Sequence, residues 1–247
     1  MPLLPGAEPF AHDDGPVGAL LLHGFGGSPA QLRPLALGLA DEGLSVLLPR
    51  LPGHGTSWQD LAVCRWDDFH AEADRALTLL LETCREVVVV GHGVGGALAL
   101  RLAELRPDDV AGLALINPAL ELRRPSRAAA VLLPVASVAA DEEVRRGGGY
   151  DRVPLRALRS VAHDGFDPVR DGIGAVTAPV LLVRSAHDRV VPPSSTEWLL
   201  EHLPGPDVTD LLLEAAGHHP QLDDDAARVE SACVDFVHRV APSSADA

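Results

Sequence analysis

The sequence contains no lysine, so that all 20 of its lysine-plus-arginine positions are arginine. Chemistry that needs a lysine, such as a Schiff base or the lysine of a P-loop, is therefore excluded. Cysteine is also scarce: the odd number of three residues indicates no disulfide framework and favours a reducing compartment. No apolar run approaches the ~18 residues of a membrane-spanning helix. The sequence thus predicts a globular protein without a membrane span.

What remains is an acidic and apolar chain. Of its 247 residues, 47% are hydrophobic, which is enough for one sizeable core. The net charge of −15 argues against nucleic acid or an anionic membrane surface as a partner. The first 15 residues have neither a basic nor an apolar segment of the kind found in signal peptides, so we expect a cytoplasmic protein.

Strand and helix patterns alternate along the chain, which is typical of a parallel sheet with helices on both faces. The expected strands are 17–22, 45–48, 86–90, 110–116, 180–185 and 208–213. The expected helices are 28–43, 67–84, one that follows the glycine turn 91–96 and runs through Leu105, 194–203 and 223–240. We expect the acidic run 223–225 in the first turn of the last helix, where it fits the helix dipole. Residues 118–174 break this rhythm. We therefore expect a core of residues 1–117 and 175–240, a cap inserted at 118–174, and a disordered tail at 241–247.

Four loops rich in glycine and histidine follow predicted strands. They are His23–Gly27, Gly91–Gly96, Ser185–Pro192 and Gly217–His219. Because the carboxyl ends of parallel strands meet at one edge of the sheet, where ligands bind in such folds, these loops predict one shared site.

These loops resemble those of the α/β-hydrolases, in particular bacterial carboxylesterases and monoacylglycerol lipases. HGFGGSP (23–29) is similar to their oxyanion loop, SAHDRVVP (185–192) to the turn with their acid, and AGHHPQLD (216–223) to the turn with their catalytic histidine. LPRLPGHGT (48–56) and YDRVPL (150–155) also match. The resemblance implies an α/β-hydrolase fold with a small cap and, as ligand, a small-molecule acyl ester or a related apolar compound.

The resemblance also implies site residues. Asp188 and His218 take the places of the acid and the histidine of the catalytic triad, in the family's chain order. The backbone N–H groups of Phe25 and Val94 take the places of the oxyanion-hole donors.

The sequence departs from the family at the nucleophile. The family's elbow has the pattern G-x-S-x-G, whereas this chain has Gly91-His92-Gly93-Val94-Gly95. Glycine has no side chain to attack an ester, so the acyl-enzyme mechanism is disabled. Loss of the nucleophile lowers the turnover of serine hydrolases by on the order of 10⁶-fold, and roughly 10³–10⁴-fold catalysis over water remains.

Gly93 also has a consequence for the backbone. The elbow residue of such enzymes has a strained conformation, which glycine adopts freely. We therefore hypothesise that Gly93→Ser lowers the stability by about 1 kcal/mol.

Four functions remain open at this stage. The chain is an esterase that acts weakly through water, a non-catalytic binding protein for a small molecule, a cofactor-free enzyme that uses the His218–Asp188 dyad as a base for another reaction, or an engineered nucleophile knockout of a normal esterase. The leading interpretation is an acyl-ester hydrolase of the carboxylesterase and monoacylglycerol lipase type with a disabled nucleophile.

A dinucleotide site is an alternative explanation of residues 91–96, because Gly91-x-Gly93-x-x-Gly96 matches G-x-G-x-x-G. The acidic residue that this fingerprint expects about 20 positions on is absent, since Asn117 ends the next strand. We therefore expect no cofactor.

The other histidines and Ser28 have structural explanations. We expect Ser28 to be a helix N-cap, His23 and His54 to hold their loops, and His187 and His219 to face solvent or the cap. No histidine pair has H-x-x-x-H spacing on a predicted helix, so we also expect no metal site.

Overall fold

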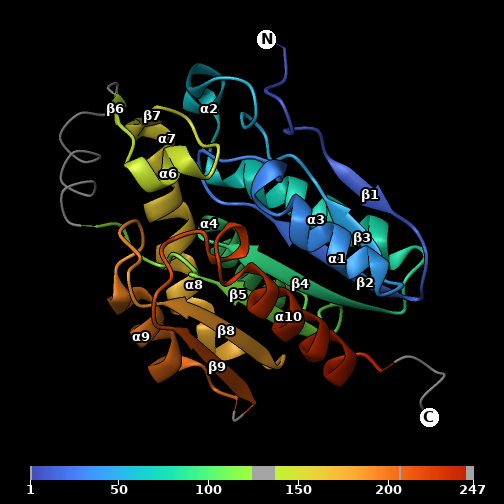
Figure 1. Cartoon of the computed structure of the whole chain (residues 1–247). Coiled ribbons are helices and arrows are strands. Elements are labelled where there is room, and N and C mark those ends of the chain that lie inside the picture. Colours follow the sequence, from blue (N-terminus) through green and yellow to red (C-terminus); the bar gives the residue numbers. More distant parts are fainter. Residues whose placement is uncertain (1, 124–136, 206, 243–247) are drawn as a thin grey trace.

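The computed structural model describes residues 2–123, 137–205 and 207–242. Its centre is a seven-stranded sheet with the order β1-β3-β2-β4-β5-β8-β9 (Figure 1). The strands are β1 (Phe10–His12), β2 (Val17–Leu22), β3 (Ser45–Leu48), β4 (Glu86–His92), β5 (Gly112–Ile116), β8 (Val180–Ser185) and β9 (Val208–Leu213). Every pair is parallel except β1 with β3. The mostly parallel sheet predicted from the sequence is therefore confirmed.

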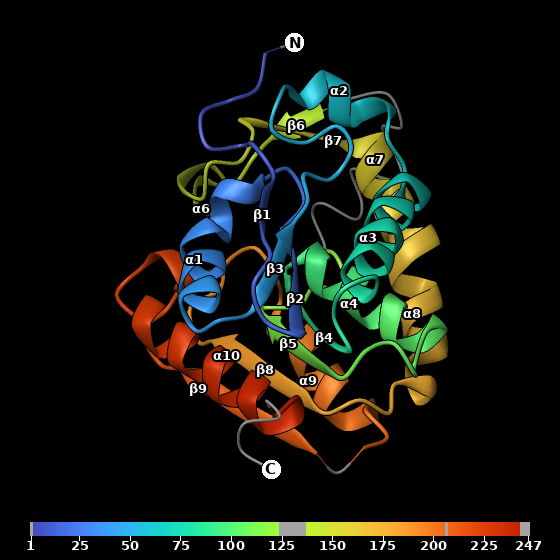
Figure 2. The same ribbon diagram turned by 90° about the vertical axis from the view of Figure 1, so that its right-hand side faces the viewer.

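Helices cover both faces of this sheet, as Figure 2 shows, with α1 and α10 on one side and α3, α4 and α8 on the other. The helices of the core are α1 (Arg33–Asp41), α2 (Trp58–Val63), α3 (Trp66–Leu81), α4 (Val94–Leu105), α9 (Pro193–His202) and α10 (Ala226–Val240). Because both faces are covered, the strands are continuous apolar runs: all six residues of β2 are buried. The same holds for β4 from Val87 to His92.

The chain between β5 and β8 adds a group of short elements, of which residues 124–136 lie outside the described part. The elements are β6 (Ser137–Ala139), α6 (Glu142–Arg146), β7 (Arg152–Pro154), α7 (Leu155–Ser160), the π-helix Val161–Phe166, α8 (Asp167–Gly172) and the 3₁₀ helix Ile173–Ala175. Strands β6 and β7 form a separate antiparallel pair. Tyr150 fastens this region to the core, since its hydroxyl donates to the carbonyl of Gly53 and accepts from the amide of Thr56.

The helix starts differ from the sequence-based expectations. The helix expected from Ser28 begins as a 3₁₀ helix at Pro29–Gln31, and α1 follows at Arg33; Ser28 occupies the N-cap position, but its side chain makes no capping hydrogen bond. The acidic run 223–225 was expected in the first turn of the last helix, and this is wrong. A 3₁₀ helix at Pro220–Leu222 and an extended Asp223 delay α10, so that Asp225 is its N-cap residue.

No helix among the described residues is long and apolar enough to cross a membrane. The expected division into core and cap stays a prediction, and residues 243–247 of the expected disordered tail lie outside the described part of the chain.

Candidate active site

The four loops that the sequence singles out meet at the carboxyl ends of the strands. Phe25 follows β2, Gly93 follows β4, Asp188 follows β8 and His218 follows β9. Gly93, Val94, Phe25 and His218 line one pocket, and Asp188 lies buried behind His218. The four loops therefore converge as expected, because the strand order brings them together although Phe25 and His218 are 193 positions apart.

The glycines of the elbow turn have different spatial requirements. A Cβ atom at Gly91 would overlap the backbone of Gly95 and Gly96, and one at Gly95 would overlap the backbone at the end of β2. A Cβ atom at Gly96 would press against Pro118. Close packing of the turn on its neighbours therefore explains these three glycines without a bound pyrophosphate.

Gly93 is the exception in this turn, because it has room for a side chain. The nearest atoms to a Cβ placed there would be Cε1 and Nε2 of His218, both at 3.7 Å, an ordinary van der Waals distance. Its backbone has φ 56° and ψ −117°, which only glycine adopts without strain. The turn thus has the strained backbone conformation expected of an elbow, and no side chain at its tip.

Asp188 holds His218 in a defined orientation. Nδ1 of His218 donates a hydrogen bond to Oδ2 of Asp188 at 2.9 Å. Oδ1 of Asp188 accepts from the amides of Val190 and Val191 at 2.7 and 2.9 Å. Since both carboxylate oxygens accept hydrogen bonds, the proton of a neutral His218 sits on Nδ1. The lone pair of its Nε2 then faces Gly93.

The oxyanion loop is held by buried polar groups. The amide of Leu51 donates to Nε2 of His23 at 3.1 Å, so Nδ1 of His23 carries the proton and donates to the carbonyl of Gly24 at 3.0 Å. The amide of Gly24 donates to Oε1 of Gln31. Burial lowers the pKa of His23 to about 4, so this histidine stays neutral and structural.

The two predicted oxyanion donors flank the same pocket. Val94 is the first residue of α4, where backbone N–H groups have no partner within the helix. Phe25 packs edge-on against His54 and Phe69, which fixes its place in the loop. His54 itself bonds the carbonyl of Pro52 through Nδ1, in agreement with the expected loop-holding role.

Asn117 is a site residue that the sequence analysis treated only as a missing acid. Its Nδ2 donates to the hydroxyl of Ser185 and to the carbonyls of Gly217 and His218, and its Oδ1 accepts from the amide of Ser185. Its φ of 43° is in the left-handed region, which asparagine tolerates better than most residues. Asn117 therefore ties the end of β5 to the loops after β8 and β9.

A cluster of three histidines is the second feature that the sequence analysis missed. The rings of His92, His218 and His219 lie 4.6 to 4.9 Å apart, centre to centre. Burial lowers the pKa of His92 well below its usual value and that of His219 to about 3. His219 faces Gly147 and is buried, whereas His187 is exposed to solvent. The spacing test for histidine pairs on one helix could not find this cluster.

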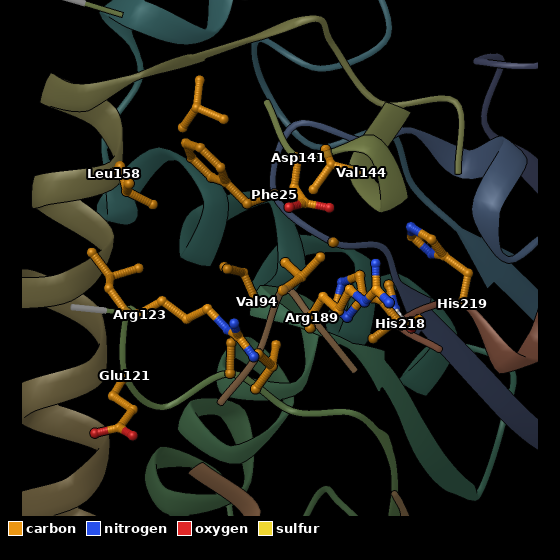
Figure 3. Close-up of a pocket in the computed structure, with 18 of the residues that line it drawn as sticks. Phe25, Val94, Glu121, Arg123, Asp141, Val144, Leu158, Arg189, His218 and His219 are labelled. Carbon is orange, nitrogen blue, oxygen red and sulfur yellow. Dashed lines mark hydrogen bonds between the residues drawn. The ribbon is translucent and has the colours of Figure 1, made fainter. Parts of the chain in front are cut away.

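The pocket is mostly apolar and has a volume of about 190 Å³. Figure 3 shows Leu158 and Arg123 on one side of it and His218 and His219 on the other. Its apolar lining includes Phe25, Val94, Leu122, Val138, Val144, Val153, Leu158, Phe166, Val190 and Val191. None of the three cysteines lines this pocket. A site of this kind suits a small apolar ligand with one polar group that points towards His218.

Comparisons with known proteins agree with this architecture. The chain is 32% identical to a thermostable monoacylglycerol lipase of Bacillus sp. (strain H-257) over 244 residues, which cover 95% of this chain and 96% of the lipase. It is 22% identical to a carboxylesterase of Bacillus subtilis (strain 168), over 94% of this chain and 97% of that protein.

Solved structures show the same fold. One from a study of LipS and LipT, two metagenome-derived lipolytic enzymes, superposes with a TM-score of 0.89 at 30% identity, covering 96% of this chain and 100% of that one. The monoacylglycerol lipase of Paleococcus ferrophilus superposes with a TM-score of 0.76 at 20% identity, over 95% and 100% of the two chains. Residues 19–232 match the family described as "Alpha/beta hydrolase family". The chain therefore belongs to the α/β-hydrolase family.

Proposed function

We propose that this protein binds carboxylic esters in the pocket above Gly93 and hydrolyses them with water, without an acyl-enzyme intermediate. The observation that carries this proposal is the orientation of His218. Its Nδ1 lies 2.9 Å from Asp188, and its Nε2 faces the space where an elbow residue would carry its side chain. A histidine held in this way is suited to be a general base.

The proposed reaction begins with a water molecule in the space above Gly93. Nε2 of His218 accepts a proton from this water while its oxygen forms a bond to the ester carbonyl carbon. The N–H groups of Phe25 and Val94 donate to the negative oxygen of the tetrahedral intermediate. The bond to the alkoxy oxygen then breaks, the alcohol takes the proton from His218, and the carboxylic acid leaves.

The expected rate is low because water replaces a covalent nucleophile. In a serine hydrolase, the oxyanion hole and substrate binding by themselves retain roughly 10³–10⁴-fold catalysis over water. Both features depend on backbone atoms and pocket shape, and neither depends on a side chain at Gly93.

The substrate class follows from the pocket and from the relatives. The lining is mostly apolar and the volume is about 190 Å³, which suits a short acyl chain. The relatives are named a monoacylglycerol lipase and a carboxylesterase, which supports esters of carboxylic acids as substrates.

We also propose that residues 118–174 act as a cap, since Val138, Val144, Val153 and Leu158 from this segment line the pocket. A cytoplasmic location fits the three free cysteines.

Binding without turnover is the second candidate function, and the absence of a nucleophile at Gly93 favours it. In that case the pocket holds an ester or a related apolar molecule, and His218 contributes no chemistry. Affinity then depends on the apolar lining and stays unchanged in His218→Ala.

One experiment separates the two candidates. Hydrolysis of p-nitrophenyl butyrate is followed with the wild-type chain and with His218→Ala, together with calorimetric binding of a non-hydrolysable ether analogue of a monoacylglycerol. The proposal expects slow hydrolysis without a burst, no labelling by a serine-directed phosphonate, and loss of hydrolysis in His218→Ala. Binding of the ether analogue with no hydrolysis by the wild-type chain would overturn it in favour of the second candidate. Hydrolysis that His218→Ala leaves unchanged would refute the assigned base.

A further inference from the structure

The cluster of His92, His218 and His219 has a feature that ester hydrolysis does not use. Three buried imidazoles converge beside the pocket: His92 ends strand β4, and His218 and His219 lie in the loop after β9, 126 positions further along the chain. One ring nitrogen from each lies within 4.8 Å of the other two. Hydrolysis by water needs only one of these rings.

The protons of two of the rings are already committed elsewhere. The N–H group at Nε2 of His92 donates a hydrogen bond to the carbonyl of His218 at 2.9 Å, so Nδ1 of His92 presents a lone pair. Nδ1 of His218 donates to Asp188, so its Nε2 also presents a lone pair. Metal-bound histidines commonly donate their other N–H group to a carboxylate or a backbone carbonyl in this way.

Two of the three imidazoles have buried ring nitrogens without a partner in the described part of the chain. Nδ1 of His92 and both ring nitrogens of His219 make no hydrogen bond among the described residues. Buried polar atoms are normally paired, and each exception requires a ligand, a water molecule or a function to explain it. His92 is fully buried and His219 is 6% exposed, so bulk water does not serve them.

We propose that His92, His218 and His219 form a binding site for one divalent transition-metal ion of the class that imidazole prefers, with Zn²⁺ as the representative ion. Three histidine ligands and an open fourth position are the ligand set of a catalytic zinc site. Zn–N bonds of 2.0–2.1 Å place tetrahedral ligand nitrogens roughly 3.3 Å apart. The nitrogens, which lie within 4.8 Å of one another, therefore have to draw together by up to about 1.5 Å when the ion binds.

Access and charge fit this site. His92, His218 and His219 line the pocket above Gly93, and a second cavity reaches His218 and His219 from the side of Glu143 and Asp223. The carboxylate of Asp188 lies directly behind His218 and partly offsets the charge of the ion. Arg146 lines the second cavity and opposes a cation, but it forms an ion pair with Glu142.

Gly93 leaves the fourth coordination position open. The nearest side chain to a Cβ at this position is His218 at 3.7 Å, so a serine hydroxyl there would occupy the space next to Nε2. The metal site and the proposed hydrolysis use the same lone pair of His218. The metal site does not rest on the proposed function, and it is tested without any ester.

The experiment uses the full chain without a histidine tag, stripped with a chelator and dialysed. Calorimetric titration with Zn²⁺ at pH 7.5 is expected to give one ion per chain, and Co²⁺ is expected to give the visible absorption of a four-coordinate nitrogen site. His219→Gln is expected to weaken binding at least 10-fold, and Asp188→Asn, which removes the carboxylate partner of His218, by about 10-fold. His238→Gln, a change of an exposed histidine on α10, is the matched control and is expected to leave affinity unchanged.

Three results would overturn the site: no saturable zinc binding by the wild-type chain, equal affinity in His219→Gln and His238→Gln, or a water molecule between the three rings in a crystal grown with Zn²⁺. Circular dichroism establishes whether His219→Gln folds. If it does not, anomalous diffraction at the zinc edge on the wild-type chain decides whether the ion lies between the three rings.

Discussion

The elbow turn and the two turns that carry Asp188 and His218 meet beside the same pocket, but they differ in the side chains they carry. The elbow has φ 56° at Gly93 and no side chain there. The other two turns have their side chains in place, with Asp188 bonded to His218. The comparison teaches that backbone strain, packing of the turn and presentation of a nucleophile are separable properties of an elbow.

The four glycines of the elbow sharpen this point. Gly91, Gly95 and Gly96 have no room for a Cβ atom, whereas a Cβ atom at Gly93 would have His218 and Gly24 as its nearest neighbours, at ordinary contact distances. Three of the glycines are thus required by packing. Packing does not require the fourth glycine, Gly93, whose backbone conformation is held by the rest of the turn.

The largest expected effect comes from restoring a nucleophile to the elbow side. Gly93→Ser places a hydroxyl within reach of Nε2 of His218, since the Cβ atom would lie 3.7 Å from it. We expect kcat for p-nitrophenyl butyrate to rise by at least about 10³-fold, with labelling by a phosphonate. Gly93→Ala is the matched control, because it adds the Cβ atom and the strain without the hydroxyl. Equal rates in the two variants would show that His218 and Asp188 do not activate a serine hydroxyl at position 93.

Two buried histidines near the pocket, His23 and His219, are expected to make the stability of the protein depend on pH. The pKa of His23 beside the oxyanion loop is lowered to about 4 and that of His219 to about 3, mainly by burial. The unfolded chain therefore binds more protons than the folded chain below about pH 6.5, so stability is complete above that pH and is lost as the pH falls towards these values. We expect each histidine to lower the free energy of unfolding by on the order of 1 kcal/mol per pH unit in this range.

Urea unfolding between pH 7.5 and pH 5 measures this dependence. His219→Gln is expected to reduce the slope against pH, while His238→Gln, at an exposed position, is expected to leave it unchanged. A free energy of unfolding that does not vary over this range would contradict the conclusion that burial lowers the pKa values of His23 and His219.

Asn117 ties the end of β5 to the turns that carry Asp188 and His218, and its removal is expected to have an intermediate effect. Asn117→Ala leaves the amide of Ser185 and the carbonyl of Gly217 without their side-chain partner, which we expect to cost about 2 kcal/mol in the free energy of unfolding. Asn117→Gly loses the same hydrogen bonds but relieves the left-handed φ of 43°. Thermal unfolding of both variants separates the two contributions. If both are as stable as the wild type, Asn117 does not hold these loops.

The smallest expected effect concerns the strain of the elbow itself. Gly93→Ala and Gly93→Ser force a residue with a Cβ atom into φ 56° and ψ −117°, so we expect each to lower stability by about 1 kcal/mol. A rise in the melting temperature of either variant would show that the turn relaxes and that the strain lies elsewhere. The control is Ala71→Ser, a change at an exposed position of α3 that is expected to leave the stability unchanged.

Local patterns were sufficient for most of the sheet. The bounds of β2, β3, β8 and β9 agree with the expected strands, because these apolar runs are bounded by glycine, proline or charged residues. β2 is buried on both faces, whereas the edge strand β9 is mostly exposed or half-buried. Strand β1 was missed, since its three residues, Phe10 to His12, become a strand only by antiparallel pairing with β3. The start of α10 was placed too early, because an acidic run favours a helix N-terminus in general and cannot show that a 3₁₀ helix precedes it.

The sequence by itself determined the parallel sheet, the order of the four loops and the absence of a side chain at Gly93, because each of these depends on residue type and on neighbours close in the chain. Only the tertiary structure decided that Asn117 bonds the loops after β8 and β9 and that His92 meets His218 and His219. The physical reason is the sheet order: β4, β5, β8 and β9 are successive neighbours, which brings residues 126 positions apart to hydrogen-bonding distance at one edge.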